Sequence, residues 1–333
     1  MAKILFRTSG GRIREKELGL GHIFRCINLG YQLKPHQIQF LIEDYGSVFP
    51  VLHEHGFKKI FNLIPGISVN DDVKKTIAHI LKNQITLLII DKYGLTNQYV
   101  KSLKKIVRVI VISDLKNIEY DSDLVIDGFI GFDNKISTNK FKTKCLLGPK
   151  YQILNQKYEN KQNYKKIYDL LITVGGFDAN DLLEIILKKI SKYEKKIKIK
   201  IILGHATKKT TIINKFTKKS NNITIINKTN NLAKEIASTK FGICAGGITT
   251  YEFATLHVPF AIVCQYKHQI FTAKEWHKRK IAKNLGFIQK DPQKIEVFLN
   301  HLMQNKIILN STNLVDGLGC KRVSVEILKM LKN

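Results

Sequence analysis

The stretch Gly19-Leu20-Gly21-His22-Ile23-Phe24-Arg25 decides how the first part of this chain is interpreted. It follows an apolar strand-like segment and a polar loop, and it leads into residues whose apolar positions have helical spacing. Its two glycines let the backbone approach a ligand closely. His22 falls in the first turn of the predicted helix, where free backbone donors favour anions, and imidazole suits proton transfer near neutrality. The residues alone leave two interpretations open, a catalytic base or a histidine in a structural turn.

Strand and helix patterns alternate along the rest of the chain. Residues 86–90 are apolar on both faces, as in a buried parallel strand, and Asp91 and Tyr93 follow directly. Open α/β sheets bind ligands beyond the carboxyl ends of their strands, so both residues are candidates for a binding site. Other strands are predicted at residues 3–8, 37–42, 108–112, 124–127, 170–174, 198–203, 223–226, 240–245 and 259–264, and helices at 48–55, 180–192, 231–238 and 322–331. The alternation predicts an α/β fold with doubly wound, Rossmann-like sheets.

The length of 333 residues suits two domains, and a hydrophobic content of 44% can fill two cores. Residues 1–154 are expected to form an N-terminal α/β domain that carries the His22 loop. A polar, lysine-rich linker is predicted at residues 155–166, followed by a second α/β domain over residues 167–320. Residues 321–333 are predicted to be a final helix.

The formal net charge of +28 raises the question of nucleic acid or an anionic membrane as a partner. Only seven of the 55 basic residues are Arg, however, and the lysines are scattered among Ile and Asn in nearly every segment. A nucleic-acid surface would concentrate Arg and aromatic side chains on one face. We therefore expect a solvated surface charge that favours an anionic small substrate and no nucleic acid.

The five cysteines are far apart and show no metal-binding spacing, so we expect a reduced, cytoplasmic protein without a metal. The first strand follows Met1 at once, and no apolar run reaches the ~20 residues of a membrane span. The expectation is a soluble protein that contacts membranes at most peripherally. The oligomeric state stays open.

Two glycine pairs, Gly175-Gly176 and Gly246-Gly247, each stand between a predicted strand and a predicted helix. Backbone amides at such turns can bind a diphosphate. Neither turn matches a dinucleotide-binding or P-loop motif, so no redox cofactor is expected. Glu252, one turn into its helix, is interpreted either as an acceptor for ribose hydroxyls or as an acidic residue favoured by the helix dipole.

Six ordered blocks together resemble the pseudaminic-acid pathway hydrolases, which remove the nucleotide from UDP-2,4-diacetamido-2,4,6-trideoxy-β-L-altropyranose. The blocks are Gly19-x-Gly21-His22-x-x-Arg25-Cys26, Asp91-x-Tyr93-Gly94-Leu95, Leu147-Gly148-Pro149-Lys150-Tyr151, Val174-Gly175-Gly176-x-Asp178, Gly246-Gly247-x-Thr249-x-x-Glu252 and Asp316-Gly317-x-Gly319-x-x-Arg322. They cover essentially the whole chain. One departure is His268-Gln269, where that family usually has Asn-Gln.

The resemblance implies a GT-B fold, in which two domains face a central cleft and the last helix packs back on the first domain. It also implies attack of water on the anomeric carbon, with no metal or cofactor, and His22 as the base. UDP would bind the second domain against Gly246-Gly247, with Glu252 near the ribose. The residues expected to bind substrate or nucleotide are Gly19, Gly21, Arg25, Asp91, Tyr93, Gly175, Gly176, Asp178, Gly246, Gly247, Thr249, Glu252, His268 and Gln269.

Two alternatives remain at this stage. A GT-B glycosyltransferase would pass the sugar from UDP to an acceptor rather than to water. A lysine-rich nucleic-acid-binding protein would bind through its charge, and that binding would fall steeply with ionic strength.

Overall fold

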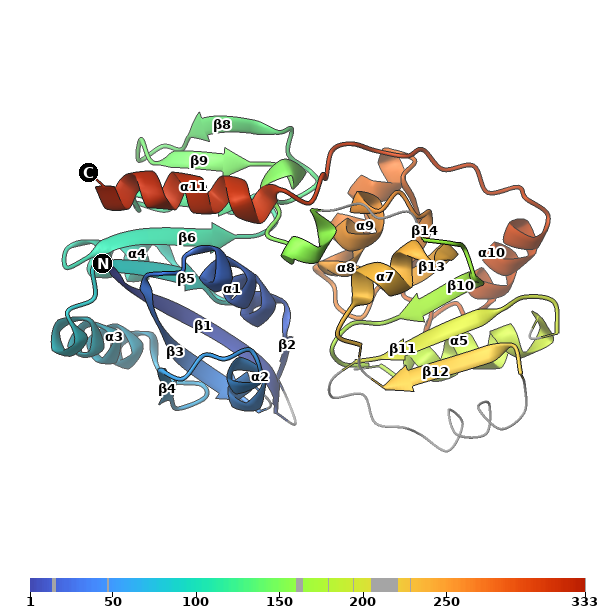
Figure 1. Cartoon of the computed structure of the whole chain (residues 1–333), viewed down its shortest axis with the longest axis horizontal. Helices are drawn as coiled ribbons and strands as arrows, with labels where there is room; N and C mark the ends of the chain where they lie inside the picture. The colour runs from blue at the N-terminus through green and yellow to red at the C-terminus, as the bar shows by residue number, and fades with distance from the viewer. Residues whose placement is uncertain are drawn as a thin grey trace. The chain divides into compact units, whose positions relative to one another are not determined.

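The structure is a computed structural model that describes residues 1–13, 16–46, 48–159, 164–178, 180–193, 195–204, 221–227 and 229–332. The chain divides into two compact units, an N-terminal unit of residues 1–156 with 317–333 and a C-terminal unit of residues 157–316. Each unit has its own largely parallel sheet with helices packed against it (Figure 1). The predicted α/β fold with two doubly wound sheets is therefore confirmed. No helix in the described part of the chain is long and apolar enough to cross a membrane.

The sheet of the N-terminal unit has the order β4-β3-β1-β5-β6-β7-β9-β8, with β2 paired to β1. Its strands are β1 (Lys3–Ile13), β2 (Lys16–Gly19), β3 (Gln37–Tyr45), β4 (Ile60–Leu63), β5 (Leu87–Asp91), β6 (Arg108–Ser113), β7 (Leu124–Asp127), β8 (Lys135–Thr138) and β9 (Lys144–Leu147). All neighbours are parallel except β1 with β2 and β8 with β9. The chain moves outward from β1 through β3 to β4 and then restarts at β5 on the other side of β1. The direction of winding therefore reverses between β1 and β5, and a binding crevice forms at such a switch point.

Helices fill the connections between these strands because each has one apolar face to bury. They are α1 (Gly21–Gln32), α2 (Val48–Glu54), α3 (Val69–Asn83), α4 (Asn97–Lys104) and the C-terminal α11 (Gly319–Lys332). All five residues of β5 are buried. Leu88 and Ile90 share a core with Ile80 of α3 and Val100 of α4, whereas the alternate residues of the strand point to the opposite face. This two-sided burial explains why β5 is apolar without alternation.

The first strand is longer than the predicted segment of residues 3–8. β1 continues to Ile13 beside β3, with Gly11 opposite Tyr45, and β2 then returns antiparallel to it. Gly11 has a φ of +105°, and a Cβ atom there would lie 2.2 Å from the carbonyl oxygen of Gly46. The polar loop predicted before Gly19 therefore includes the end of β1 and the antiparallel strand β2.

Helix α11 begins at Gly319 rather than near Arg322 and belongs to the N-terminal unit. It packs on α1 and on the 3-10 helix η1 (Pro149–Tyr151) through an apolar stripe that includes Val323 and Ile327. Lys144 of β9 forms an ion pair of 2.5 Å with Glu326. Gly319 allows the early start, because a Cβ atom at this position would lie 2.1 Å from the carbonyl oxygen of Gln152.

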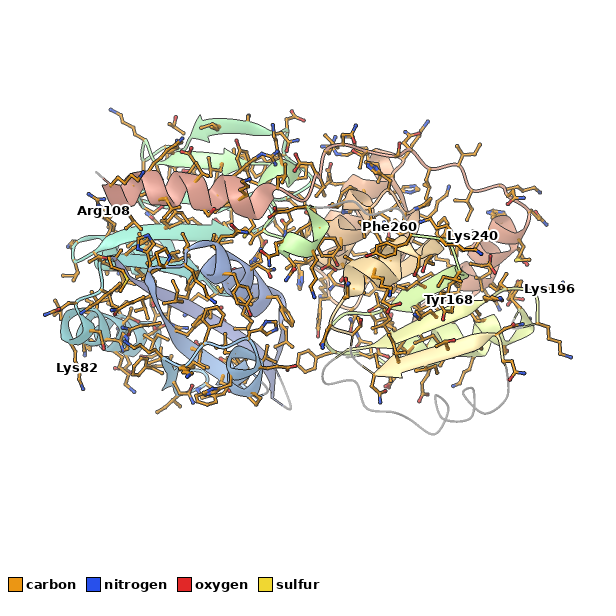
Figure 2. All side chains as sticks on the ribbon, viewed as in Figure 1. Lys82, Arg108, Tyr168, Lys196, Lys240 and Phe260 are labelled. Carbon is orange, nitrogen blue, oxygen red and sulfur yellow. The ribbon has the colours of Figure 1, made fainter. Side chains whose placement is uncertain are left out.

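The C-terminal unit has a parallel sheet of order β12-β11-β10-β13-β14-β15, which reverses direction between β10 and β13. The strands are β10 (Tyr168–Thr173), β11 (Ile199–Leu203), β12 (Ile223–Asn227), β13 (Thr239–Ala245), β14 (Phe260–Val263) and β15 (Ala282–Gly286), and the helices are α5 (Leu182–Ile190), α7 (Leu232–Ala237), α8 (Thr249–Thr255), α9 (Gln269–Lys278) and α10 (Gln293–Met303). Two further 3-10 helices are η2 (Gln156–Tyr158) and η3 (Ser191–Tyr193). Phe260 lies in the core of this unit, whereas Lys82 and Lys196 extend outward from their units (Figure 2).

The polar linker predicted over residues 155–166 contains an unexpected buried group. Residues 156–158 form the helix η2, and the side chain of Tyr158 is only 2% exposed. Residues 160–163 of the predicted linker lie outside the described residues. The described part of this segment is therefore packed structure as well as a connection.

Candidate functional site

The switch point of the N-terminal unit brings His22 to Asp91. Asp91 ends β5 and is fully buried, whereas His22 lies in the first turn of α1 with its side chain 18% exposed. Nδ1 of His22 is 2.5 Å from Oδ1 of Asp91. Nη2 of Arg25 also lies 2.8 Å from Nδ1, but this nitrogen donates to Asp91 and Asp114. Because a carboxylate only accepts, we assign the hydrogen to Nδ1, which donates it to Asp91. This tautomer leaves Nε2 of a neutral His22 as a proton acceptor.

Arg25, one turn further along α1, bridges two carboxylates in this site. Its guanidinium donates to Asp91 through Nε at 2.9 Å and Nη2 at 2.7 Å, and to Asp114 through Nη1 at 2.5 Å and Nη2 at 2.9 Å. The side chain is 6% exposed. The sequence predicts Arg25 as a substrate-binding residue, but four of its hydrogen bonds go to these two carboxylates. In this structure Arg25 orients Asp91, because two bonds in a fork fix the plane of the carboxylate.

Two further acids near this position are absent from the predicted site. Asp114 follows β6 and Asp127 ends β7, so both lie at the same edge of the sheet as Asp91. Burial, together with the charge of Asp114, raises the pKa of Asp127 to about 7. The carboxyl group of Asp127 accepts hydrogen bonds from the backbone amides of Lys116 and Phe129, both at 2.9 Å. Asp114 and Asp127 each stand at the end of an apolar strand, which is the same sequence signal that predicts Asp91.

The other predicted residues of the N-terminal unit lie close to His22 or Asp91 in sequence. Gly19 ends β2 with a φ of +68°, and Gly21 is the exposed first residue of α1. Tyr93 follows β5 and is 63% exposed. Of these three residues, Gly21 and Tyr93 are exposed to solvent.

In the C-terminal unit, the two glycine pairs follow the strands that flank its switch point. Gly175 and Gly176 come after β10, and Gly246 and Gly247 come after the neighbouring β13. Gly175 has a φ of +92°, which favours glycine. A Cβ atom on Gly246 would lie 2.8 Å from Cβ of Gln269, whereas one on Gly247 would meet nothing within 4 Å. Gly246 therefore serves close packing, and Gly247 is the open position of the loop.

Asp178 changes the expectation for the first glycine pair. Its carboxylate accepts hydrogen bonds from the amides of Leu182 at 2.8 Å and Leu183 at 2.9 Å, at the start of α5. The sequence predicts that the amides of this helix bind a diphosphate, but the capping carboxylate already occupies these two donors. Asp181 adopts a φ of +51° and delays the helix to Leu182, rather than the predicted start near residue 180. Asp178 is therefore a capping residue in this structure.

The loop of Gly246 and Gly247 is held by Thr250, which the sequence does not predict as a site residue. Thr250 is fully buried; its hydroxyl donates to the carbonyl oxygen of Gly247 at 2.8 Å and accepts from Nε1 of Trp276 at 3.0 Å. Thr249 and Glu252 lie on the same short helix, α8, with Glu252 partly exposed. Burial raises the pKa of the Glu252 carboxyl to about 7, although interactions with Tyr158 and Thr249 lower it.

His268 and Gln269 lie at the start of α9 and differ in their surroundings. His268 is exposed and stacks on Tyr266 with 5.5 Å between ring centroids. Gln269 is 7% exposed, and its Oε1 accepts from the backbone amide of Gln265 at 2.8 Å. Nε2 of Gln265 donates in turn to the carbonyl oxygen of Val174 at 2.6 Å. The sequence predicts Gln269 as a ligand-binding residue, but this chain of bonds makes it a brace between the loops after β14 and β10.

The chain is similar to known families and structures of nucleotide-sugar proteins in both sequence and fold. Residues 169–314 match the glycosyltransferase family 28 C-terminal domain. The C-terminal unit therefore resembles a family 28 domain over most of its length. The match covers the strands on both sides of the switch point and both glycine pairs.

Three relatives extend the similarity beyond the family 28 domain. A Bacillus subtilis spore coat polysaccharide biosynthesis protein is 26% identical over 92% of this chain and 94% of its own length. The Campylobacter jejuni UDP-2,4-diacetamido-2,4,6-trideoxy-β-L-altropyranose hydrolase is 25% identical over 84% of this chain and 97% of its own length. An uncharacterised Methanocaldococcus jannaschii protein is 26% identical over 76% of this chain. The chain spans 54% of the length of that last relative.

Solved structures show the same fold over the whole chain. Acinetobacter baumannii MurG superposes with a TM-score of 0.65 at 15% identity, covering 99% of this chain and 100% of that one. S. aureus MnaA, solved with UDP, also gives 0.65, at 12% identity, covering 100% and 97%. The predicted GT-B-like fold is confirmed by these structures.

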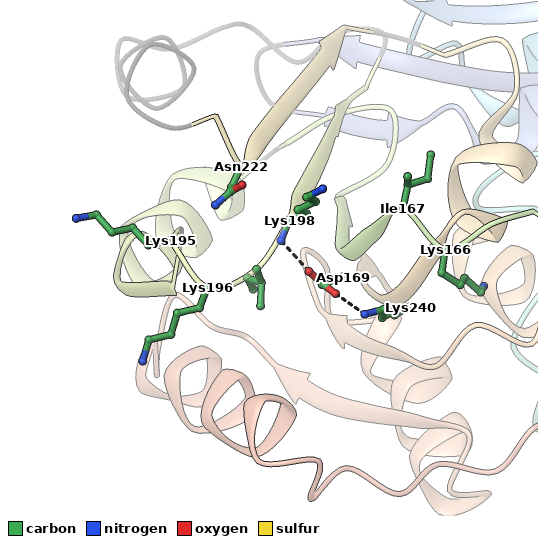
Figure 3. Close-up of a pocket in the computed structure, with 9 residues that line it drawn as sticks. Lys166, Ile167, Asp169, Lys195, Lys196, Lys198, Asn222 and Lys240 are labelled. Atoms are coloured by element: carbon green, nitrogen blue, oxygen red, sulfur yellow. Dashed lines mark hydrogen bonds and ion pairs between the residues drawn. The ribbon is translucent and has the colours of Figure 1, made fainter.

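A lysine-rich concavity of about 360 Å³ lies at the opposite edge of the sheet in the C-terminal unit (Figure 3). It is lined by Lys166, Ile167, Asp169, Lys195, Lys196, Ile197, Lys198, Asn222 and Lys240, which lie at the amino ends of β10 to β13. Asp169 accepts from the amide of Lys198 at 2.9 Å and from Nζ of Lys240 at 2.8 Å. Ligands of open α/β sheets bind beyond the carboxyl ends, so the glycine loops and not this concavity form the candidate site.

Proposed function

We propose that this protein is a nucleotide-sugar hydrolase that releases UDP and a free sugar from a UDP-linked diacetamido-trideoxyhexose. The observation that carries the proposal is the pairing of His22 with Asp91 at the carboxyl edge of the N-terminal sheet. The pairing directs one ring nitrogen to a buried carboxylate and leaves the other to accept a proton. A base held in this way can activate water, which is the nucleophile of a hydrolase.

The proposed reaction uses His22 as the general base. A water molecule donates a proton to Nε2 as its oxygen bonds to the anomeric carbon of the sugar. The bond between that carbon and the diphosphate oxygen breaks, and its electron pair leaves with UDP. Asp91 stabilises the imidazolium that forms, and the two hydrogen bonds from Arg25 hold Asp91 in place.

The proposal assigns the nucleotide to the family 28 domain. The open loop at Gly247, together with Gly246 and Thr249, would receive the diphosphate, and Glu252 would accept hydrogen bonds from the ribose hydroxyls. The loop of Gly175 and Gly176 and the exposed His268 are proposed as neighbouring contacts. Gly19, Gly21 and Tyr93 are proposed as sugar contacts on the N-terminal unit. No metal or cofactor has a role in this scheme.

The relatives support this reaction class. The Campylobacter jejuni hydrolase acts, by its name, on the UDP-sugar proposed here, and the Bacillus subtilis relative takes part in polysaccharide biosynthesis. We accordingly propose a role in pseudaminic acid or surface polysaccharide biosynthesis. A GT-B glycosyltransferase is the second candidate, and the match of residues 169–314 to a glycosyltransferase family favours it.

An assay without acceptor separates the two candidates. The purified protein is incubated with the UDP-sugar and EDTA, and UDP and free sugar are measured separately. A hydrolase yields equal amounts of both. Absence of UDP release, restored by adding an acceptor extract, would establish the transferase instead.

A further inference from the structure

The buried hydroxyl of Tyr158 has no role in the fold described so far. Tyr158 ends η2 and is 2% exposed, and its hydroxyl has no partner at full hydrogen-bond geometry among the described residues. Burying a hydroxyl without a good partner is costly, and such a group in a folded protein needs an explanation. Phenylalanine would pack the same ring without this cost.

The charged group that acts on this hydroxyl is the carboxyl of Glu252. Burial, and then the nearby Glu252 carboxylate, raise the pKa of Tyr158 well above its ordinary value. The phenol therefore keeps its proton and can only donate toward a carboxylate. Nζ of Lys157 donates to the carbonyl oxygen of Asn230 at 2.5 Å and anchors this segment to the loop before α7. Tyr158 is thus held beside Glu252 by its buried ring and by its neighbour.

Glu252 has few other groups to fix its orientation. The titratable or polar groups recorded around it in the described chain are Tyr158, Thr249 of the same helix, and Cys244 at the end of β13. None of the three is a cation. The donors available to fix the orientation of this carboxylate are therefore the hydroxyls of Tyr158 and Thr249.

We propose that Tyr158 is a positioning residue for Glu252: it donates to one carboxylate oxygen and turns the group so that it accepts both ribose hydroxyls of a nucleoside diphosphate. This inference rests on the proposed function, which assigns the ribose to Glu252. The consequence is that the preference for ribonucleotides depends on the hydroxyl of Tyr158, which does not itself contact the nucleotide. A residue from the predicted linker would then set part of the specificity of the nucleotide site.

The test compares the dissociation constants of UDP and 2′,3′-dideoxy-UDP by calorimetry between pH 5.5 and 8.5. Both ligands carry the same diphosphate. The dissociation constant of 2′,3′-dideoxy-UDP divided by that of UDP therefore isolates the contribution of the ribose hydroxyls at each pH. For the wild type we expect this ratio to fall at acid pH, because a protonated Glu252 accepts fewer hydrogen bonds. Tyr158→Phe should lower the ratio about tenfold at pH 8 and move the midpoint of its pH dependence upward, since a donor to the carboxylate is lost.

Three variants make the outcome decisive. Tyr193→Phe is the matched control, because its hydroxyl bonds to Asn300 at 2.5 Å in another part of the same unit, and it should leave the ratio and the midpoint unchanged. Glu252→Gln should abolish the preference, and adding Tyr158→Phe to it should change nothing more. An unchanged preference in Glu252→Gln would refute the ribose assignment itself. If Glu252→Gln loses the preference but Tyr158→Phe keeps the wild-type ratio and midpoint, only the positioning role is refuted. The same conclusion follows if Tyr158→Phe weakens the binding of both ligands equally.

Discussion

Nδ1 of His22 lies 2.5 Å from Oδ1 of Asp91, although the two residues are 69 positions apart in the chain. Asp91 is paired in register with Thr8 of β1, the strand whose connection leads into α1. The contact therefore depends on β1 and β5 being neighbours in the sheet. It joins a partly exposed imidazole to a fully buried carboxylate, an arrangement that fixes the tautomer of a general base.

His22→Asn is expected to lower the turnover of the UDP-sugar about 100-fold or more while UDP affinity stays nearly unchanged. Asparagine keeps a hydrogen-bonding side chain of similar reach but cannot accept a proton from water. UDP release and UDP affinity are measured on the same preparation. Near wild-type turnover would leave His22 with a structural role only.

Asp91→Asn is expected to reduce turnover by about 100-fold or more, because an amide no longer favours the tautomer with a free Nε2. Asp114→Asn is its matched control, since Asp114 also accepts hydrogen bonds from Arg25, whereas Asp91 is the carboxylate bonded to Nδ1 of His22. Both variants weaken the Arg25 network and should lower the unfolding temperature. Only Asp91→Asn should abolish most of the activity; equal losses in both would contradict a specific role of the His22–Asp91 pair.

Glu252→Gln should weaken UDP binding by about 1 to 3 kcal/mol if the carboxylate accepts the ribose hydroxyls. Because the pKa of this carboxyl is raised to about 7, wild-type affinity should also increase between pH 6 and pH 8 by more than the variant's does. Calorimetric titration with UDP in EDTA measures both effects. The assignment fails if the variant binds UDP as the wild type does, or if magnesium is indispensable for binding.

Asp127→Asn should alter the pH dependence of stability. The pKa of Asp127 is raised to about 7 in the folded protein, above the ordinary value of about 3.9. Between these values the folded state keeps a proton that the unfolded state has lost, so this group's contribution to stability falls as pH rises. The free energy of unfolding of Asp127→Asn relative to wild type should therefore be more favourable at pH 8 than at pH 5. Urea titrations at both values test this, and a pH-independent difference would show that the carboxyl is ionised throughout.

The sequence by itself determined the class of the fold, and it marked the loops that we propose as ligand-binding places. Residues 86–90 are apolar without alternation because both faces of β5 are buried, and this pattern can be recognised without knowing the neighbours of the strand. Glycine pairs after apolar runs likewise marked the loops of the C-terminal unit. His22 and Asp91 were each predicted as residues at the carboxyl edge of a sheet.

Only the tertiary structure decided which of these residues touch. Arg25 and Gln269 read as ligand-binding residues in the sequence, yet one bridges Asp91 and Asp114 and the other braces two loops. Tyr158 read as part of a polar linker, yet it is buried beside Glu252. The physical reason is that a local pattern reports burial and backbone preference, whereas a hydrogen bond needs two partners at a fixed distance. In a parallel sheet, the order of the strands brings such partners together from distant parts of the chain.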